Sequence, residues 1–365
     1  MTKQLNYYRL NQLAHLGLPE QIFIPAFLQE LHYEIPSISN SFCWQNNTES
    51  LCNIYDEKSN TKVIQDFIAT VSNSASDKHS YTKEWVSELD KPTTSLENFG
   101  QCTFIAEFYK TVLLPLNYYN TCFTPVFSQE NTTRLGILMI HRDKLNRHFS
   151  SEEIDSFSHI SSLLSYGLSH VDNKPVHTID GWEQGLLIVD EQGKLQDACT
   201  TGEKLISLAS SSVFNSASST IATNDIHIFD GLDQLIKTLL KSKKYHLPIA
   251  DPTLTTSNAW GEFKLRGFLI KDKAGKRAPR IGLSIRWQEP FVLRIFHRIK
   301  TLGLTPRQET VGLFYAIGDQ HQMIANKLNL SPYTVKEHIK NLTQRLNIHS
   351  RADFIELLLC DGVSE

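Results

Sequence analysis

Two lysines set four residues apart are the side chains of this sequence best placed to do chemistry. Lys336 and Lys340 fall on one face of a helix, with Glu337 beside them. Ammonium groups on such a face can bind phosphate oxygens, and a helix held by its opposite face can lie in the major groove of DNA. An ordinary solvated helix surface would carry the same two lysines, so the interpretation depends on the elements that position them.

The apolar residues around the two lysines predict the helix that carries them. Val335, Ile339, Leu342 and Leu346 recur at spacings of four, three and four, which places them on one face of a helix over residues 332–346. That face is expected to pack on neighbouring helices. The lysines then point away from the packed side and remain available to a partner.

Capping signals predict the other helices of this region. Thr305 is a hydroxyl N-cap, followed by Pro306 in the first turn and by Gln308, whose amide can bond back to the cap. Gly318 can end that helix, because glycine adopts the left-handed conformation without a clash. The expected caps of the three following helices are Asp319 with Gln322, Ser331 before Pro332, and Ser350 with Asp353.

This C-terminal stretch is basic, whereas the rest of the chain is acidic. Residues 291–351 contain nine Lys or Arg and three Asp or Glu, a net charge of +6, in a chain whose formal net charge is −3. The remainder therefore carries −9, and residues 353–365 are acidic again. A basic module joined to an acidic body is the charge distribution expected of a phosphate-binding part attached to a separate sensory part.

Several short motifs between residues 304 and 352 occur in one register. They are Leu304-Thr305-Pro306-Arg307, Ala316-Ile317-Gly318, Ile324-Ala325, Leu328, Leu330-Ser331, Thr334-Val335-Lys336, His338, Leu346 and His349-Ser350-Arg351-Ala352. Together they resemble the LuxR-type (GerE-like) helix-turn-helix of bacterial transcription regulators. The resemblance implies that the positions of Lys336, Glu337 and Lys340 face bases or phosphates, and that the fourth helix supplies a dimer contact.

The resemblance extends to a wider set of residues and to partners. The residues expected to contact DNA are Ser331, Tyr333, Thr334, Lys336, Glu337, Lys340 and Arg345 on the third helix, with Lys327 on the second. A homodimer on double-stranded DNA and a contact with RNA polymerase are implied as well. The sequence departs from the family pattern at Gln308, where a glutamate is common, and at Gly312, where a leucine is common. Glycine inside a helix costs about 1 kcal/mol relative to alanine, so the first helix is expected to be weakly formed in isolation.

Residues 1–172 are expected to form a first domain built around an antiparallel sheet. Two N-terminal helices are expected near residues 10–18 and 24–31, with Pro25 in a first helical turn. The further expected elements are strands at 41–44, 51–55, 121–127 and 134–141, a loop-rich stretch at 71–100, and helices at 104–114 and 150–168. The closing order, with Phe149-Ser150-Ser151-Glu152-Glu153-Ile154 before the last helix, resembles the end of a GAF sensory domain.

Residues 173–289 are expected to form a second domain. The expected elements are a hairpin over residues 185–195, a short helix at 203–208, a serine-rich loop at 209–225, and strands at 262–271 and 280–287 joined by a basic turn at 272–277. A hairpin, then small helices, then a terminal hairpin resembles a PAS domain. Trp260, Phe263, Phe268 and Trp287 could line a pocket there, although aromatic residues on alternating strands usually form the core.

The cysteines and histidines show no pattern of a metal site. Six cysteines are scattered without a Cys-x-x-Cys pair, which argues against zinc and against a disulfide framework. The neighbours of Cys199 supply no charge that would stabilise a thiolate. His141, His148, His159 and His170 do not share a helix face at ligand spacing and are expected in the core or on the surface.

Other features exclude several classes of protein. No Gly-rich phosphate loop, nucleophile elbow or pair of catalytic carboxylates occurs, which argues against an enzyme. The first residues lack a signal region and no run approaches about 18 apolar residues, so a cytoplasmic protein without a membrane contact is expected. No cofactor is expected.

The sequence therefore predicts a multidomain α+β protein with a GAF-like first domain, a PAS-like second domain and an all-α, four-helix C-terminal head at residues 290–365. The predicted function is that of a bacterial one-component transcription regulator whose front domains (residues 1–172 and 173–289) sense an unidentified small molecule or partner. One alternative is a signalling protein whose head binds a protein instead of DNA. An enzyme housed in the front domains is a third hypothesis.

Overall fold

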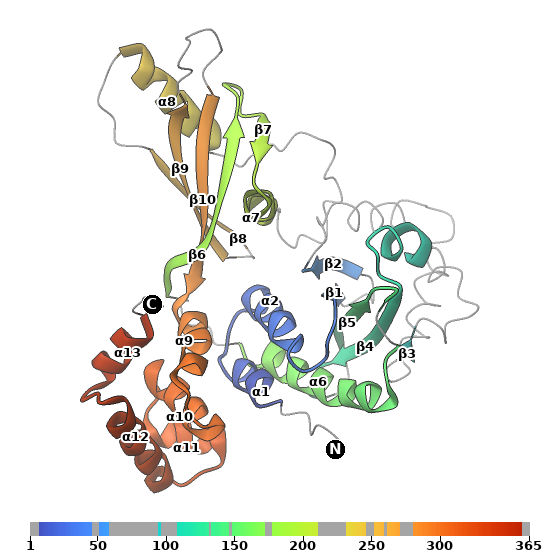
Figure 1. The fold of residues 1–365 in the computed structure, drawn as a ribbon, viewed down its shortest axis with the longest axis vertical. Coiled ribbons are helices and arrows are strands. Elements are labelled where there is room, and N and C mark those ends of the chain that lie inside the picture. The colour runs from blue at the N-terminus through green and yellow to red at the C-terminus, as the bar shows by residue number, and fades with distance from the viewer. Residues whose placement is uncertain are drawn as a thin grey trace.

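The structure, a computed structural model, consists of two antiparallel sheets and a group of C-terminal helices (Figure 1). It describes residues 7–45, 51–57, 94–95, 108–130, 133–145, 148–171, 177–210, 231–245, 252–258, 261–270 and 280–359. Figure 1 shows the second sheet extending away from the C-terminal helices, while the N-terminal helices lie beside them. The mixed α+β class expected from the sequence is confirmed.

The first sheet has α-helices on one face and a π-helix on the other. Its strands are β1 (Ser39–Gln45), β2 (Leu51–Asp56), β3 (Thr94–Ser95), β4 (Asn120–Phe127) and β5 (Arg134–Arg142), in the order β2-β1-β5-β4-β3. Helices α1 (Tyr8–Ala14), α2 (Glu20–Leu31) and α6 (Ser151–Ser169) cover one face, where Phe42 and Leu138 are fully buried. The other face carries a second cluster with Ile137 and Met139, against the π-helix Tyr109–Leu113. The alternation of these residues follows from the two-residue period of a strand.

The second sheet repeats the strand order of the first. Its strands are β6 (Thr178–Val189), β7 (Leu195–Ala198), β8 (Thr253–Asn258), β9 (Gly261–Ile270) and β10 (Arg280–Pro290), in the order β7-β6-β10-β9-β8. Helices α7 (Thr200–Ser210) and α8 (Leu232–Tyr245) pack on it. Leu187, Leu265 and Leu283 are buried at its centre. Numbered within each sheet, both run second, first, fifth, fourth, third.

Most elements expected in the two front domains are confirmed, and α6 begins with the expected cap. Ser150 Oγ accepts a hydrogen bond from Glu153 N at 3.2 Å, and Glu153 Oε2 accepts one from Ser150 N at 2.8 Å. The expectation for Pro25 is wrong: α2 begins at Glu20, so the proline lies inside the helix and not in its first turn. Pro19 at the N-cap, followed by Glu20 in the first turn, is the start signal that the periodicity of the apolar residues concealed.

Two elements between residues 173 and 289 were not predicted. Helix α8 and strand β8 were not expected from the sequence. Thr94–Ser95, inside the expected loop-rich stretch, forms strand β3 and pairs with β4. The rest of residues 71–100, residues 104–107, 211–225 and 272–277, and Trp260 lie outside the described residues.

The C-terminal part follows β10 without a gap. Helix α9 (Phe291–Ile299) starts directly after Pro290, and a short 3-10 turn (Lys300–Leu302) leads to the last four helices. These are α10 (Pro306–Ala316), α11 (His321–Leu328), α12 (Pro332–Leu346) and α13 (Arg351–Leu359). Arg294 Nε bonds Glu289 Oε2 at 2.6 Å in a buried ion pair, which fixes the direction in which α9 leaves the sheet.

Helix α1 holds this C-terminal part through buried polar contacts. The Arg9 guanidinium donates to the carbonyl oxygen of Phe296 at 3.1 and 3.2 Å. Its Cζ atom also lies 3.6 Å from the centroid of the Phe296 ring. Its Nε also bonds Glu30 at 3.0 Å. Gln12 Nε2 donates to Thr310 Oγ1 at 2.7 Å. Helix α1 is therefore joined to α9 and α10 directly.

Candidate nucleic-acid interface

The caps of α10 and α12 are those that the sequence predicted. Thr305 Oγ1 accepts from Gln308 N at 3.3 Å, and Gln308 Oε1 accepts from Thr305 N at 3.1 Å. Ser331 Oγ accepts from Thr334 N at 3.0 Å. These contacts satisfy amide groups that a helix leaves unpaired at its start. The glutamine therefore completes the capping box in place of the family's glutamate.

The predicted cap of α11 is wrong. The N-cap of this helix is Gln320, and its side chain makes no capping hydrogen bond. Asp319 instead accepts a hydrogen bond from Lys327 Nζ at 2.7 Å, and Gln322 donates to Asn326 Oδ1 at 3.1 Å. Gly318 ends the preceding turn with φ +105°, as expected. This turn places the carboxylate of Asp319 beside the end of α11, where Lys327 binds it.

Helix α12 has the two-sided character that the sequence predicted. Val335 and Leu342 are fully buried and Ile339 is 8 % exposed, so one face packs on the other helices. Lys336 and Lys340 are exposed on the opposite side, and Glu337 is half-buried. Figure 1 shows α12 on the outer side of the helical group, away from α1 and α6. The two lysines are thus presented on an anchored helix at the periphery of the molecule.

Of the other residues expected to contact DNA, Tyr333 is open to solvent, and the rest already have partners within the protein. Tyr333 is 74 % exposed at the start of α12 and is open to a partner. Ser331 and Thr334 are held by the cap, with their hydroxyl oxygens 2.8 Å apart. Arg345 donates to the carbonyl oxygen of Gly303 at 2.5 Å. Lys327 pairs with Asp319 and lies 4.8 Å from the Phe314 ring centroid.

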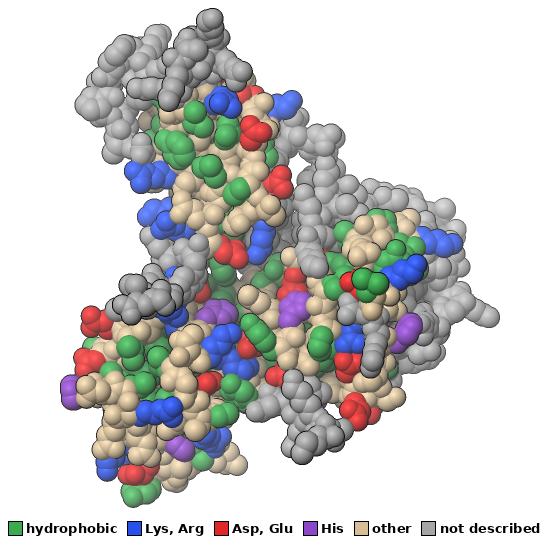
Figure 2. Space-filling model, viewed as in Figure 1, with side chains coloured by type: hydrophobic (Ala, Val, Ile, Leu, Met, Phe, Trp, Pro, Cys, Tyr) green, Lys and Arg blue, Asp and Glu red, His purple; other side chains and the backbone are tan. Residues whose placement is uncertain are grey.

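These contacts determine which side chains are most available to bind DNA. Lys336 and Lys340 lie nearest the free face of α12, together with Tyr333. Arg345 and Lys327 already bind groups within the protein, so a DNA phosphate would have to share these side chains with their present partners or replace those partners. Figure 2 shows Lys and Arg side chains at several places on the C-terminal helices on the face in view.

Gly312 lies where α10 comes closest to its neighbours. A Cβ at this position would lie 2.8 Å from Leu342 Cδ1, 3.0 Å from Ile299 Cδ1 and 3.4 Å from Phe354 Cζ. The missing side chain therefore allows α9, α12 and α13 to converge on α10. The sequence indicated a weak helix at this glycine but gave no sign of this close packing.

A buried polar network lies on the face of the first sheet opposite α2. His141 and Asp56 are both buried, and the Ser41 hydroxyl lies between them, 2.5 Å from Asp56 Oδ2 and 2.7 Å from His141 Nε2. Thr121 Oγ1 lies 2.9 Å from His141 Nδ1, and Tyr118 donates to Asp56 Oδ1 at 2.9 Å. Burial lowers the pKa of His141 to about 4, against the opposing effect of the Asp56 charge. The imidazole is a neutral core group whose two nitrogens both have hydroxyl partners.

Cys199 has a different environment from the one expected. Its Sγ accepts hydrogen bonds from the backbone N–H of Leu186 at 3.2 Å and of Gly202 at 3.3 Å. These amides lower the pKa of the exposed thiol below its ordinary value. The sequence offered no charged neighbour, and stabilisation by the start of α7 could only be seen in the fold.

Two absences hold for the part of the chain that the structure describes. Within these residues no cluster of three or more His, Cys, Asp or Glu side chains could hold a metal ion. None of the described helices is long and apolar enough to cross a membrane.

The geometry of the last four helices agrees with a known family. Residues 302–358 match the model of the bacterial regulatory proteins of the luxR family. This segment is a LuxR-type helix-turn-helix domain, with α12 as the third of its four helices.

Curated relatives match a part of this chain. The HTH-type transcriptional regulator MalT of Vibrio campbellii is 33% identical over 94 residues, which cover 24% of this chain and 10% of that protein. MalT of Vibrio cholerae is 34% identical over 80 residues, which cover 20% of this chain and 9% of that protein. The chain thus spans about a tenth of the length of these relatives.

Solved structures give distant similarities over longer stretches. The DhaR(N)–DhaL complex of Escherichia coli is 13% identical with a TM-score of 0.24, covering 76% of this chain and 87% of that chain. A VqmA–ligand–DNA complex of Vibrio cholerae is 16% identical with a TM-score of 0.19, covering 58% of this chain and 88% of that chain. At these TM-scores the similarity carries no conclusion about this chain.

Proposed function

We propose that this protein is a bacterial one-component transcription regulator whose head binds double-stranded DNA through α12. The observation that carries the proposal is the pair of exposed lysines, Lys336 and Lys340, on a helix whose other face is buried. Phosphate contacts of this kind fix a helix on the duplex, and neighbouring side chains read the bases. Tyr333 and Glu337 are the neighbours best placed for that role.

The front domains are proposed to be sensory, the first GAF-like (residues 1–172) and the second PAS-like (residues 173–289). The hairpin β6–β7, the helices α7 and α8, and the terminal strands β9 and β10 follow the element order expected of a PAS-like domain. The sheets of the two front domains have the same strand order, so the two domains share one architecture. A domain of this size beside a DNA-binding head is suited to binding an effector and shifting the head between two states.

The working form is proposed to be a cytoplasmic homodimer without catalytic activity. Leu357 on α13 is 40 % exposed, and the fourth helix is where the LuxR resemblance implies a dimer contact. Two heads related by a twofold axis would fit a partly symmetric operator. A contact with RNA polymerase belongs to the same proposal.

The test of DNA binding compares Lys336→Ala and Lys340→Ala with the unaltered protein. Each variant should weaken binding to an operator fragment selected from genomic DNA. Each should also reduce the slope of log affinity against log salt concentration by about 1, because one phosphate contact is lost. Binding is measured by fluorescence anisotropy over a series of salt concentrations.

Lys237→Ala on α8 is the matched control, because it removes an exposed lysine outside the head. It should leave both affinity and salt slope unchanged. Unchanged DNA binding in both head variants would contradict the assignment of α12 as the helix that binds DNA. A head that ignores DNA at moderate salt but retains a protein partner would favour the alternative, a signalling protein with a protein-binding head.

A further inference from the structure

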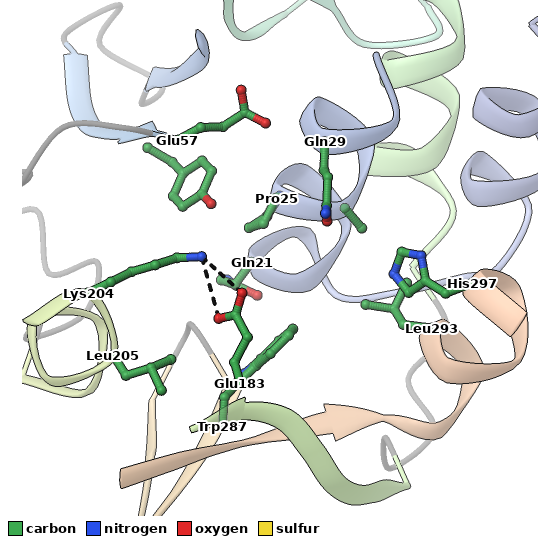
Figure 3. A pocket seen from close by; sticks show the side chains of 12 residues that line it. Gln21, Pro25, Gln29, Glu57, Glu183, Lys204, Leu205, Trp287, Leu293 and His297 are labelled. Atoms are coloured by element: carbon green, nitrogen blue, oxygen red, sulfur yellow. Dashed lines mark hydrogen bonds and ion pairs between the residues drawn. The ribbon is translucent and has the colours of Figure 1, made fainter. Parts of the chain in front are cut away.

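A cavity lies where the first domain, the second domain and helix α9 meet. Its volume is about 220 Å³. Helix α2 lines it with Gln21, Pro25 and Gln29, and α9 lines it with Leu293 and His297. The remaining lining residues are Ala26, Tyr55, Glu57, Glu183, Lys204, Leu205 and Trp287. Figure 3 shows the labelled side chains approaching one space from these separate elements.

The size of the cavity limits what can occupy it. Pockets for drug-sized ligands have volumes of roughly 300–1,000 Å³. This cavity is therefore suited to a smaller ligand with a compact body.

The charged groups of the lining favour a cation. Glu57 and Glu183 contribute two carboxylates and Lys204 one ammonium group. Burial lowers the pKa of His297 to about 4, so its imidazole is neutral at pH 7 and adds no positive charge. Glu57 Oε2 already bonds His32 Nε2 at 2.7 Å and the backbone N–H of Asn40 at 2.7 Å. Glu183 is therefore the carboxylate of the lining that a ligand cation would bind.

Lys204 already shows how a cation fits this site. Its Nζ lies 3.3 and 3.4 Å from the two carboxylate oxygens of Glu183, as Figure 3 shows. Both side chains are about half exposed, at 46 % and 45 %. A pair this exposed contributes little to stability, so a ligand ammonium can take the place of Lys204 without a large loss.

The apolar walls define the rest of the ligand. Pro25, Leu205 and Leu293 lie around the cavity with the ring of Trp287. An aliphatic or aromatic body would cover these side chains, and an aromatic ring also favours a nearby cation. The amides of Gln21 and Gln29 can bond a further polar group.

We propose that this junction cavity binds a small organic cation, consisting of an ammonium group on a compact apolar body. The assignment deepens the proposed function, because it places the effector site where both front domains touch the helix that leads into the head. Leu293 and His297 lie on α9, whose Phe296 carbonyl is held by Arg9. An occupant would contact α2 and α9 together.

The test measures binding to the full chain by isothermal titration calorimetry in the absence of DNA. The probes are 2-phenylethylamine, the neutral 2-phenylethanol and the anionic 3-phenylpropionate, which share one ring and differ in charge. The amine should bind up to about fivefold more tightly than the alcohol, as expected for one half-exposed ion pair. The carboxylate should not bind.

Two variants of the exposed pair should then shift the affinity in opposite directions. Glu183→Gln removes a carboxylate and should weaken amine binding up to about fivefold. Lys204→Gln removes the competing ammonium and should strengthen it. Glu191→Gln, which makes the same charge change at an exposed site outside the cavity, should have no effect.

Each other outcome overturns the proposal. Absence of amine binding at millimolar concentration would show that the cavity is not a cation site. Equal binding of the three probes would show that charge does not select the ligand. Weakening by both Glu183→Gln and Lys204→Gln would assign the pair a structural role alone. Because no DNA is present, these results are independent of whether α12 binds an operator.

Discussion

Cys199 is the residue whose reactivity depends most on its position in the fold. It stands immediately before α7, and two backbone amides point at its sulfur. Since these amides favour the thiolate, its pKa lies below that of a free cysteine. The thiolate therefore persists to lower pH in the folded protein than in the unfolded chain.

This lowered pKa predicts a shifted alkylation profile. The rate of modification of Cys199 by iodoacetamide should reach half its maximum at a lower pH in the folded protein than in urea. Peptide mass spectrometry after timed quenching separates this cysteine from the others. Cys122 is the internal control, because burial raises its pKa to about 12 and should keep it unmodified in the folded state. Identical folded and unfolded profiles for Cys199 would contradict the role of the amides.

Single residues of the interface could be predicted where a local rule governs them. The caps at Thr305 and Ser331 depend only on neighbouring residues, so the sequence predicted both correctly. The pairing of Lys327 with Asp319 and of Arg345 with Gly303 depends on how separate helices meet. A pattern within one helix holds no information on such contacts, so the sequence treated these two cations as available for DNA.

At the scale of elements, α10 depends on the absence of a side chain at Gly312. Three side chains from α9, α12 and α13 lie within 3.4 Å of the place where its Cβ would stand. A leucine, which the LuxR pattern commonly has there, would overfill this space. The helix is held by tertiary packing, which offsets the intrinsic cost of glycine.

Gly312→Leu is therefore expected to destabilise the head by about 1–3 kcal/mol, the usual cost of overpacking. Leucine's higher helix propensity would return only about 1 kcal/mol. Hydrogen exchange of the α10 amides in the full chain measures the change, with faster exchange expected. Gln344→Leu introduces the same side chain at an exposed position of α12 and should leave α10 protected. Slower exchange in Gly312→Leu would show that the neighbours can make room.

The elements of the sheets were predictable where hydrophobic alternation is strong. Strand β5, with an almost continuous buried run, was expected within one residue of its observed bounds. Strand β8, Thr253–Asn258, has few large apolar residues and lies at the sheet edge, so it gave no strand pattern. Helix α8 carries several lysines, and its apolar residues pack on β8 and β9, a tertiary contact that a pattern within one helix does not reveal.

At the scale of the whole molecule, the sequence could not reveal the contact between α1 and the head. We call this contact, made by Tyr8, Arg9 and Gln12, the joint. Arg9 and Glu30 are 5 % exposed, and Phe296 completes the coordination of the guanidinium. Tyr8 adds a hydrogen bond to Glu309 at 3.1 Å. The residues involved lie nearly three hundred positions apart, and no pattern links them along the chain.

Arg9→Ala is expected to release the head from the first domain. The substitution leaves Glu30 buried without its partner, a change that costs about 3–5 kcal/mol in comparable pairs. Small-angle X-ray scattering should show a larger radius of gyration. We propose that the acidic front part of the chain restrains the basic head, so affinity for operator DNA should rise towards that of a fragment from about residue 291 onward. Arg280→Ala removes an exposed arginine and is the control; an unchanged radius in Arg9→Ala would refute the joint.

The joint between α1 and the head also bears on how the protein is made. Its hydrogen bonds link residues 287, 298 and 301 positions apart. A ribosome adding roughly 5–20 residues per second would need roughly fifteen to sixty seconds between α1 and its partners on α9 and α10. During that interval Arg9 can already pair with Glu30, but the partners that Arg9 and Gln12 bind on α9 and α10 do not yet exist. The surface that emerges early in synthesis is covered late, and a chain halted before α10 would leave that surface open to quality control.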